Sequence, residues 1–114
     1  MSENRFPLDV NGDVLRSMER NGANFNISHN IDFEVVTPSE EAAERLAVMV
    51  RSWGYSADIV FPGCVPALPW EVHIVRRMLP THEGITKFES ELEREAALVG
   101  GRNDGWGCLT VKAN

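Results

Sequence analysis

The sequence has little cysteine, little positive charge and no long apolar run, and each shortage excludes a class of protein. Its 114 residues include two cysteines, 11 Lys and Arg and 17 Asp and Glu, which gives a formal net charge of −6 at pH 7. Two cysteines are too few for a secreted disulfide scaffold. An acidic chain also lacks the basic patch with which nucleic-acid-binding domains contact phosphates. We therefore expect no direct nucleic-acid partner.

Signals for secretion and membrane insertion are also missing. No basic segment with an apolar core follows Met1, so the sequence predicts no signal peptide. The longest apolar-rich run, Ile59 to Trp70, contains three prolines and a glycine and is too short to span a bilayer. We expect a cytoplasmic protein without a membrane partner, in which Cys64 and Cys108 are reduced thiols.

The remaining composition is that of an ordinary globular domain, with 43% hydrophobic and 25% charged residues. Residues 1–114 are expected to form a single domain that needs neither a disulfide nor a metal for stability, with residues 1–8 flexible.

Helix-capping residues and hydrophobic spacing predict three helices. Asp9 or Asn11 can cap the first, which residues 21–22 end. Thr37 is expected to cap the second, with Pro38 at its first helical position. The predicted buried positions of the second helix are Ala42, Leu46, Met49, Val50 and Trp53.

The third helix is expected to begin after Thr81 and to end at residues 100–101. Its predicted buried positions are Ile85, Phe88, Leu92, Ala96 and Val99. Alternation of apolar and polar residues predicts strands over residues 27–36, 55–61, 70–75 and 106–111, the last after a turn at residues 103–105.

This order, an N-terminal helix followed by β-α-β-β-α-β, predicts an α+β fold. Two interleaved right-handed crossovers give a ferredoxin-like antiparallel sheet with two helices on one face. The other face is left open or is covered by the first helix. By strand alternation, that face carries Asp32, Glu34, Asp58, Glu71 and His73.

No recognisable set of catalytic or metal-binding residues emerges from the spacing. His29, His73 and His82 are predicted at a strand start, in mid-strand and at a helix start, and no nucleophile motif accompanies them. Catalysis by Cys64 or Cys108 is disfavoured, because Cys108 is better explained as a small buried residue. We expect no cofactor, no metal and no catalytic activity.

A signature near the C-terminus resembles a known family. The sequence Asp-Gly-Trp-Gly-Cys at residues 104–108 is accompanied by Trp-Glu-Val at 70–72, Met-Leu-Pro-Thr at 78–81, Ile-Thr at 85–86 and Gly-Asp-Val-Leu at 12–15. Together, from about Asn11 to Val111, they resemble the regulator of ribonuclease activity B family, the protein inhibitors of ribonuclease E. The resemblance implies a small, acidic, cytoplasmic protein that binds the endonuclease and restrains RNA cleavage without catalysis.

The predicted function is therefore a non-enzymatic regulator that binds ribonuclease E or a related RNA-processing protein. An acidic sheet face suits a basic, flexible target segment. The residues predicted to contact the partner are Asp32, Glu34, Asp58, Glu71, Asp104 and Trp106. Trp106 also has a structural interpretation, since an aromatic after a tight turn can pack over the end of the sheet.

Two other functions remain open at this point. A ferredoxin-like small-molecule sensor or enzyme would need a concave pocket with perturbed titratable groups. An RNA-binding sheet of the same topology would need exposed aromatic residues on which bases stack.

The connection from Pro62 to Pro69 is unusually apolar for a hairpin loop. Its prolines predict a semi-rigid loop instead of further strand. Val65 and Leu68 could cover the sheet edge or the first helix. Alternatively, they could contact a partner chain, either the regulated target or a second copy in a homodimer.

Overall fold

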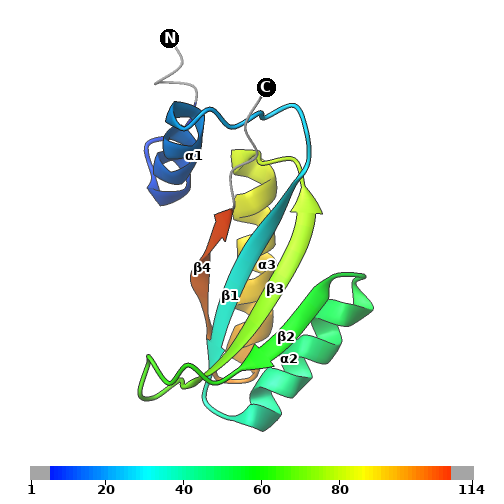
Figure 1. Ribbon diagram of the computed structural model, residues 1–114. Coiled ribbons are helices and arrows are strands. Elements are labelled where there is room, and N and C mark those ends of the chain that lie inside the picture. The colour runs from blue at the N-terminus through cyan, green and yellow to red at the C-terminus, as the bar shows by residue number, and fades with distance from the viewer. Residues whose placement is uncertain (1–5, 109–114) are drawn as a thin grey trace.

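The computed structural model describes residues 6–108, except for the side chain of Cys108. The elements are α1 (Val10–Arg20), β1 (His29–Thr37), α2 (Glu40–Ser52), β2 (Ser56–Val60), β3 (Trp70–Met78), α3 (His82–Leu98) and β4 (Arg102–Cys108) (Figure 1). This confirms the predicted α+β class and the predicted order of elements.

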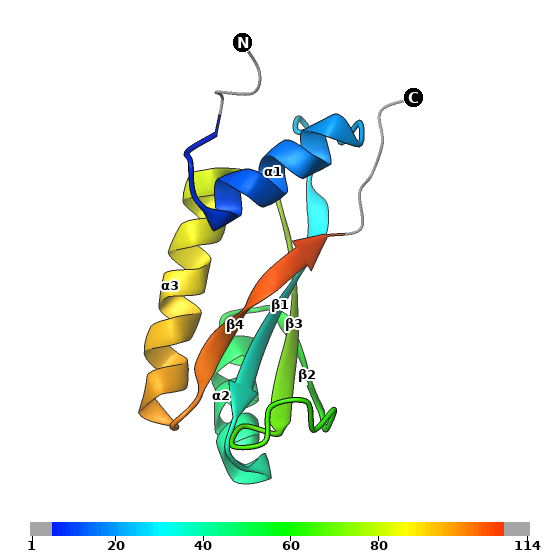
Figure 2. The same ribbon diagram turned by 90° about the vertical axis from the view of Figure 1, so that its left-hand side faces the viewer.

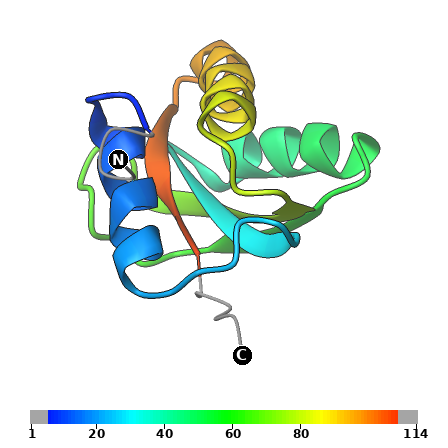
Figure 3. The same ribbon diagram turned by 90° about the horizontal axis from the view of Figure 1, so that it is seen from above.

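The four strands form one antiparallel sheet in the order β2-β3-β1-β4. Strand β3 therefore lies between the two strands that α2 connects, and β1 lies between the two strands that α3 connects. Helices α2 and α3 cover one face of the sheet (Figure 3). The finer, ferredoxin-like assignment stays a prediction.

Helix α1 lies beside the β4 edge and packs against α3 (Figures 2 and 3). Asp9 caps α1 as predicted, because its carboxylate accepts a hydrogen bond of 2.7 Å from the Gly12 N–H. No described helix covers the face of the sheet opposite α2 and α3, which we call the open face. Within the described residues, no helix is long and apolar enough to cross a membrane.

The hydrophobic core lies between the sheet and the α2–α3 layer. Phe88 of α3 is 1% exposed, and its ring meets that of Phe33 edge-on at 4.7 Å between centroids. The Arg76 guanidinium lies over the rings of both Tyr55 and Phe88. Burying one large apolar side chain contributes about 1.5–3 kcal/mol, so this aromatic cluster is a main stabilising contact between helix and sheet. Phe6, within the stretch expected to be flexible, is also buried in the core.

The start of α2 differs from the prediction. Its N-cap is Ser39, whose hydroxyl accepts from the Ala42 N–H at 3.1 Å, so Thr37 and Pro38 lie outside the helix. Thr37 remains the last residue of β1, buried with its hydroxyl 3.1 Å from the Trp70 carbonyl oxygen. Pairing with β3 thus holds Thr37 in the strand and moves the cap by two residues.

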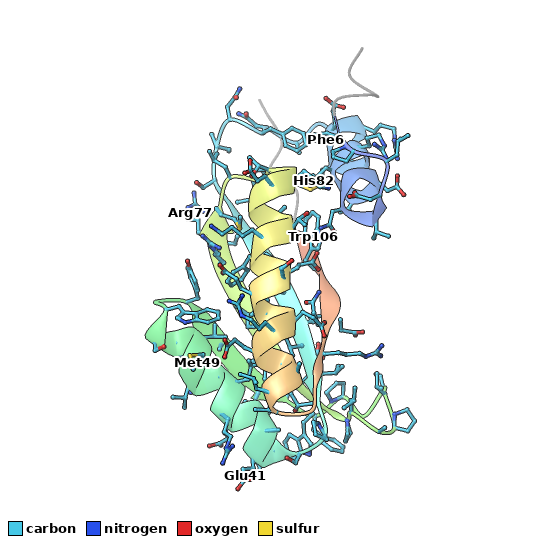
Figure 4. The ribbon with its side chains drawn as sticks, turned by 180° about the vertical axis from the view of Figure 1, so that it is seen from behind. Phe6, Glu41, Met49, Arg77, His82 and Trp106 are labelled. Atoms are coloured by element: carbon cyan, nitrogen blue, oxygen red, sulfur yellow. The ribbon has the colours of Figure 1, made fainter. Side chains whose placement is uncertain are left out.

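The predicted buried face of α2 is wrong at one position. Met49 is 41% exposed and lies on the outer side of the helix (Figure 4). Trp53 is only half-buried and caps the C-terminus, as Val99 does for α3. The other seven predicted positions of the two helices are buried in the core: Ala42, Leu46, Val50, Ile85, Phe88, Leu92 and Ala96. Ala43 and Ala47 are further buried positions that the prediction omitted.

The predicted turn at residues 103–105 is also wrong, because these residues lie within β4. The β1–β4 register pairs Glu34 with Gly105 and Val35 with Asn103, so Asp104 is the extra residue of a β-bulge. Gly105 has φ of 115°, a conformation that favours glycine. Residues 109–111 of the predicted strand lie outside the described residues.

The segment from 61 to 69 contains no strand, which confirms the predicted loop. The Leu68 N–H donates to the Val65 carbonyl at 3.0 Å, and both side chains are half-buried. The loop lies at the end of the sheet far from α1, so of the two alternatives, covering the sheet edge or covering the first helix, the second is wrong (Figures 1 and 2).

Candidate functional site

The open face carries a row of acidic side chains around one histidine. The strand registers place Glu34 of β1 and Asp58 of β2 on either side of His73 in β3. Directly opposed residues of antiparallel strands have Cβ atoms about 5 Å apart, so these three side chains are neighbours. The Asp32 carboxylate lies 3.5 Å from His73 Nε2. His73 is thus the centre of the cluster, although sequence reasoning left it out of the partner-contacting residues.

Glu71 forms a hydrogen-bonded carboxyl pair with Glu34. It lies two residues before His73 on β3, and therefore diagonally across from Glu34. Burial, the hydrogen bond with Glu34 and the negative charges of Glu34 and Asp104 raise the pKa of Glu71 to about 7. One of the two carboxyls therefore keeps a proton at mildly acidic pH.

The bulge in β4 brings Asp104 to this face. Its carboxylate lies 3.8 Å from Arg102 Nη2, and it acts electrostatically on Glu71. Gly105 and Gly107 of β4 pair with Glu34 and Asp32. A Cβ built at either glycine would meet no other atom within 4 Å, so β4 leaves these carboxylates open on its side.

Trp106, the sixth predicted contact residue, lies on the opposite face of the sheet. It pairs with Phe33 and lies on the helix side of β4 (Figure 4). Its indole N–H donates to Asn11 Oδ1 at 2.8 Å, and the Asn11 amide donates to Thr86 Oγ1 and Glu89 Oε1 at 3.0 and 2.9 Å. The tryptophan therefore connects β4 to α1 and α3, which favours its structural interpretation.

Sequence reasoning missed Asn11 as the centre of this network, because it was considered only as a helix cap. Asn103 belongs to the same network from the other side, since its side-chain amide donates to Glu89 Oε2 at 2.9 Å and its backbone N–H donates to Glu93 Oε1 at 2.9 Å. No local pattern in the sequence indicates contacts between residues 75 or more positions apart.

The residues considered for catalysis are dispersed. Cys64 is exposed in the loop after β2, while the His82 imidazole contacts the Asp9 carboxylate at 2.8 Å at the start of α1. Among the described residues, no three His, Cys, Asp or Glu are arranged to hold a metal ion. A cavity of about 680 Å³ lies along α2 and is lined by Glu40, Glu41, Glu44, Arg45 and Val48, none of which is on the open face.

Comparison with protein families matches this chain to one model. Residues 8–108, from before α1 to the end of β4, match the model described as regulator of ribonuclease activity B. The chain belongs to the regulator of ribonuclease activity B family. This confirms the resemblance seen in the sequence, and it identifies the protein as a member of a family of regulators of ribonuclease activity. No curated protein matches the chain.

Proposed function

We propose that this protein is a non-enzymatic regulator that binds ribonuclease E, or a related RNA-processing protein, through the open face and limits RNA cleavage. The observation that carries this proposal is the gathering of Asp32, Glu34, Asp58 and Glu71 on one uncovered face of a member of this family. The proposal places the protein in the cytoplasm with its partner.

Charge supports a basic partner segment. Of the arginines on the described strands, Arg77 and Arg102 lie at the margins of the open face, opposite Asn30 and Val36, and the centre contains carboxylates and His73. An acidic surface attracts lysine and arginine side chains and raises the rate of encounter. The same charge repels the phosphates of RNA, so the regulator acts on the enzyme and not on the substrate.

The alternative functions receive less support. The described strands place no aromatic side chain on the open face, where an RNA-binding sheet would stack bases. The cavity along α2 lies away from the only carboxyl whose pKa is raised to near neutrality among the described residues, so it does not have the pocket chemistry expected of an enzyme or sensor.

The test compares two triple variants that remove the same number of carboxylates. Asp32→Asn, Glu34→Gln and Glu71→Gln neutralise the open face, whereas the control changes Glu41, Glu44 and Glu83, exposed on α2 and α3, to Gln. Association with purified ribonuclease E is followed by stopped-flow fluorescence at pH 8 and low salt, and inhibition is followed by cleavage of a labelled RNA.

We expect the open-face triple variant to associate roughly tenfold or more slowly, with a smaller change in dissociation rate. Wild-type association should slow as salt rises, because the Debye length falls to about 8 Å at physiological ionic strength. If the open-face and control variants associate at the same rate, the open face is not the contact surface.

A further inference from the structure

We infer that the Glu34–Glu71 pair makes the open face a proton-linked binding surface: a cationic group of the partner displaces the shared proton, so binding tightens as pH rises. This inference rests on the proposed function, because it assigns a regulation to the same face.

The first support is the geometry of the pair. Residues diagonal to one another across antiparallel strands lie within reach of long side chains, and Glu34 and Glu71 occupy such positions on one face. Their carboxyls are hydrogen-bonded to each other. A carboxylate is only an acceptor, so the bond requires a proton on one partner. Both side chains are half-buried, which disfavours a second negative charge.

The second support is the charge of every element around the pair. Asp32 on β1, Asp58 on β2 and Asp104 on β4 are acidic neighbours, and none of the ion pairs in the described residues joins a lysine or arginine to Glu34 or Glu71. The nearby basic side chains are Arg102, which is paired with Asp104, and His73, which contacts Asp32. A proton is therefore the group that offsets the second charge of the pair in the free protein, in agreement with the pKa of about 7 at Glu71.

A lysine or arginine of the partner can take over this role. Once an ammonium or guanidinium group lies at the pair, both carboxyls are stabilised as anions and the proton passes to the solvent. Because a proton must leave before binding, affinity at pH 6 should be about tenfold weaker than at pH 8.

The test has two readouts on the intact protein. Carbon-13 NMR follows the glutamate side-chain carboxyls of the free protein from pH 4 to pH 9. Calorimetric titration with hexa-arginine at pH 6, 7 and 8, in two buffers of different ionisation enthalpy, measures affinity and the number of protons released. Glu71→Gln removes the shared proton, and Asp58→Asn is the matched control, which removes a carboxylate of the same face outside the pair. His73→Gln is a second control, which removes the imidazole beside Asp32 and keeps both carboxyls of the pair.

We expect one carboxyl of the pair to titrate near neutral pH and approximately one proton to be released on binding at pH 6. Asp58→Asn should weaken binding and keep the release, whereas Glu71→Gln should bind with the release and most of the tenfold pH dependence lost.

If both carboxyls of the pair titrate at ordinary glutamate pKa values, the inference is overturned. The proposed function still stands in that case, provided that hexa-arginine binds. Proton release that persists in Glu71→Gln also overturns it, because the proton then belongs to another group. If wild type does not bind hexa-arginine at any pH while the carboxyl titrates near neutrality, the proposed function and the coupling both fail, and the NMR result separates this outcome from a wrong assignment of the proton.

Discussion

The two faces of the sheet differ in how their polar groups are satisfied. On the helix-covered face, the Trp106 indole, the Asn11 amide and the Glu89 carboxylate satisfy one another in a network that joins β4, α1 and α3. On the open face, carboxylates neighbour other carboxylates. Their mutual repulsion contributes to the raised pKa of Glu71, which favours its protonated form. The first arrangement stabilises the fold by itself, whereas the second, under the proposed function, is completed by a positive charge of the partner.

Within a single strand, the residues that stabilise the fold and the residues proposed to bind the partner therefore lie on opposite faces. In β1, Phe33 and Val35 point into the core, while Asp32 and Glu34 point to the open face. Because successive residues of a strand alternate between faces, a substitution at one position changes one face and leaves the contacts of the other face in place. Substitutions on the two faces should therefore have distinct effects, which the following predictions order from largest to smallest.

The largest loss of stability is expected for Phe88→Ala on the helix-covered face. The substitution leaves a cavity beside Phe33, Trp53 and Tyr55, whose rings all contact that of Phe88. Removing a buried phenylalanine costs about 3–5 kcal/mol, and urea denaturation of the variant and of wild type tests this expectation. Met49→Ala on the exposed side of α2 is the control and should cost less than about 0.5 kcal/mol. Equal losses in the two variants would mean that the core is not centred on Phe88.

Asn11→Ala should have an intermediate effect that is confined to stability. The substitution leaves the Trp106 N–H without its acceptor and removes a donor from Thr86 and Glu89. Loss of such half-buried partners costs about 1–3 kcal/mol. Exposed Asn30 of β1 provides the control Asn30→Ala. Association with ribonuclease E should be unchanged in the folded fraction, and slower association would place the α1 side within the interface.

Much of this architecture was predictable from local patterns. Strand alternation placed Asp32, Glu34, Asp58 and Glu71 on one face, because a strand has a fixed period of two and the core residues between them are strongly apolar. Thr81 was correctly identified as a helix cap, and Asp9 was one of two candidates for the first cap, since a capping side chain interacts only with the next three residues.

The errors arose where tertiary contacts decide between local alternatives. Thr37 and Ser39 are both good helix caps, and the pairing of Thr37 with Trp70 in the sheet decides in favour of Ser39. Residues 103–105 have the composition of a turn, but pairing with β1 converts them into a bulged strand. The hydrogen bond between Glu34 and Glu71 depends on strand register, which periodicity alone does not fix.

The pH dependence of stability provides a third prediction, on the open face. The pKa of Glu71 is raised from 4.5 to about 7 in the folded protein, so the folded state holds the proton more tightly than the unfolded state. Its stabilising contribution is complete below pH 4.5 and is lost as pH rises through 7. After allowance for partial solvent exposure, we expect wild type to lose about 1 kcal/mol between pH 5 and pH 8 from this group.

Urea midpoints at the two pH values measure this loss. Glu71→Gln should be insensitive over the interval, while Asp58→Asn should keep most of the wild-type dependence. Asp9 does not interfere, because its pKa is lowered by the Gly12 N–H and by His82, and its contribution is lost only as pH falls below the chosen range. A pH-dependent loss that is undiminished in Glu71→Gln would contradict the assignment.

The smallest effect is expected at the apolar loop between β2 and β3. Val65 and Leu68 are half-buried, and their loop lies at one end of the sheet (Figure 1), so replacing both with Ser should remove contact with the fold and little else. We expect a loss below about 1 kcal/mol, seen as a melting temperature lower by a few degrees. Molecular mass by light scattering and association with ribonuclease E should stay as in wild type.

Pro66→Ala, at an exposed position of the same loop, controls for changes in loop rigidity. Unchanged melting together with loss of a dimer or of ribonuclease binding would instead make this loop an interface. Binding would then involve the loop after β2 as well as the open face.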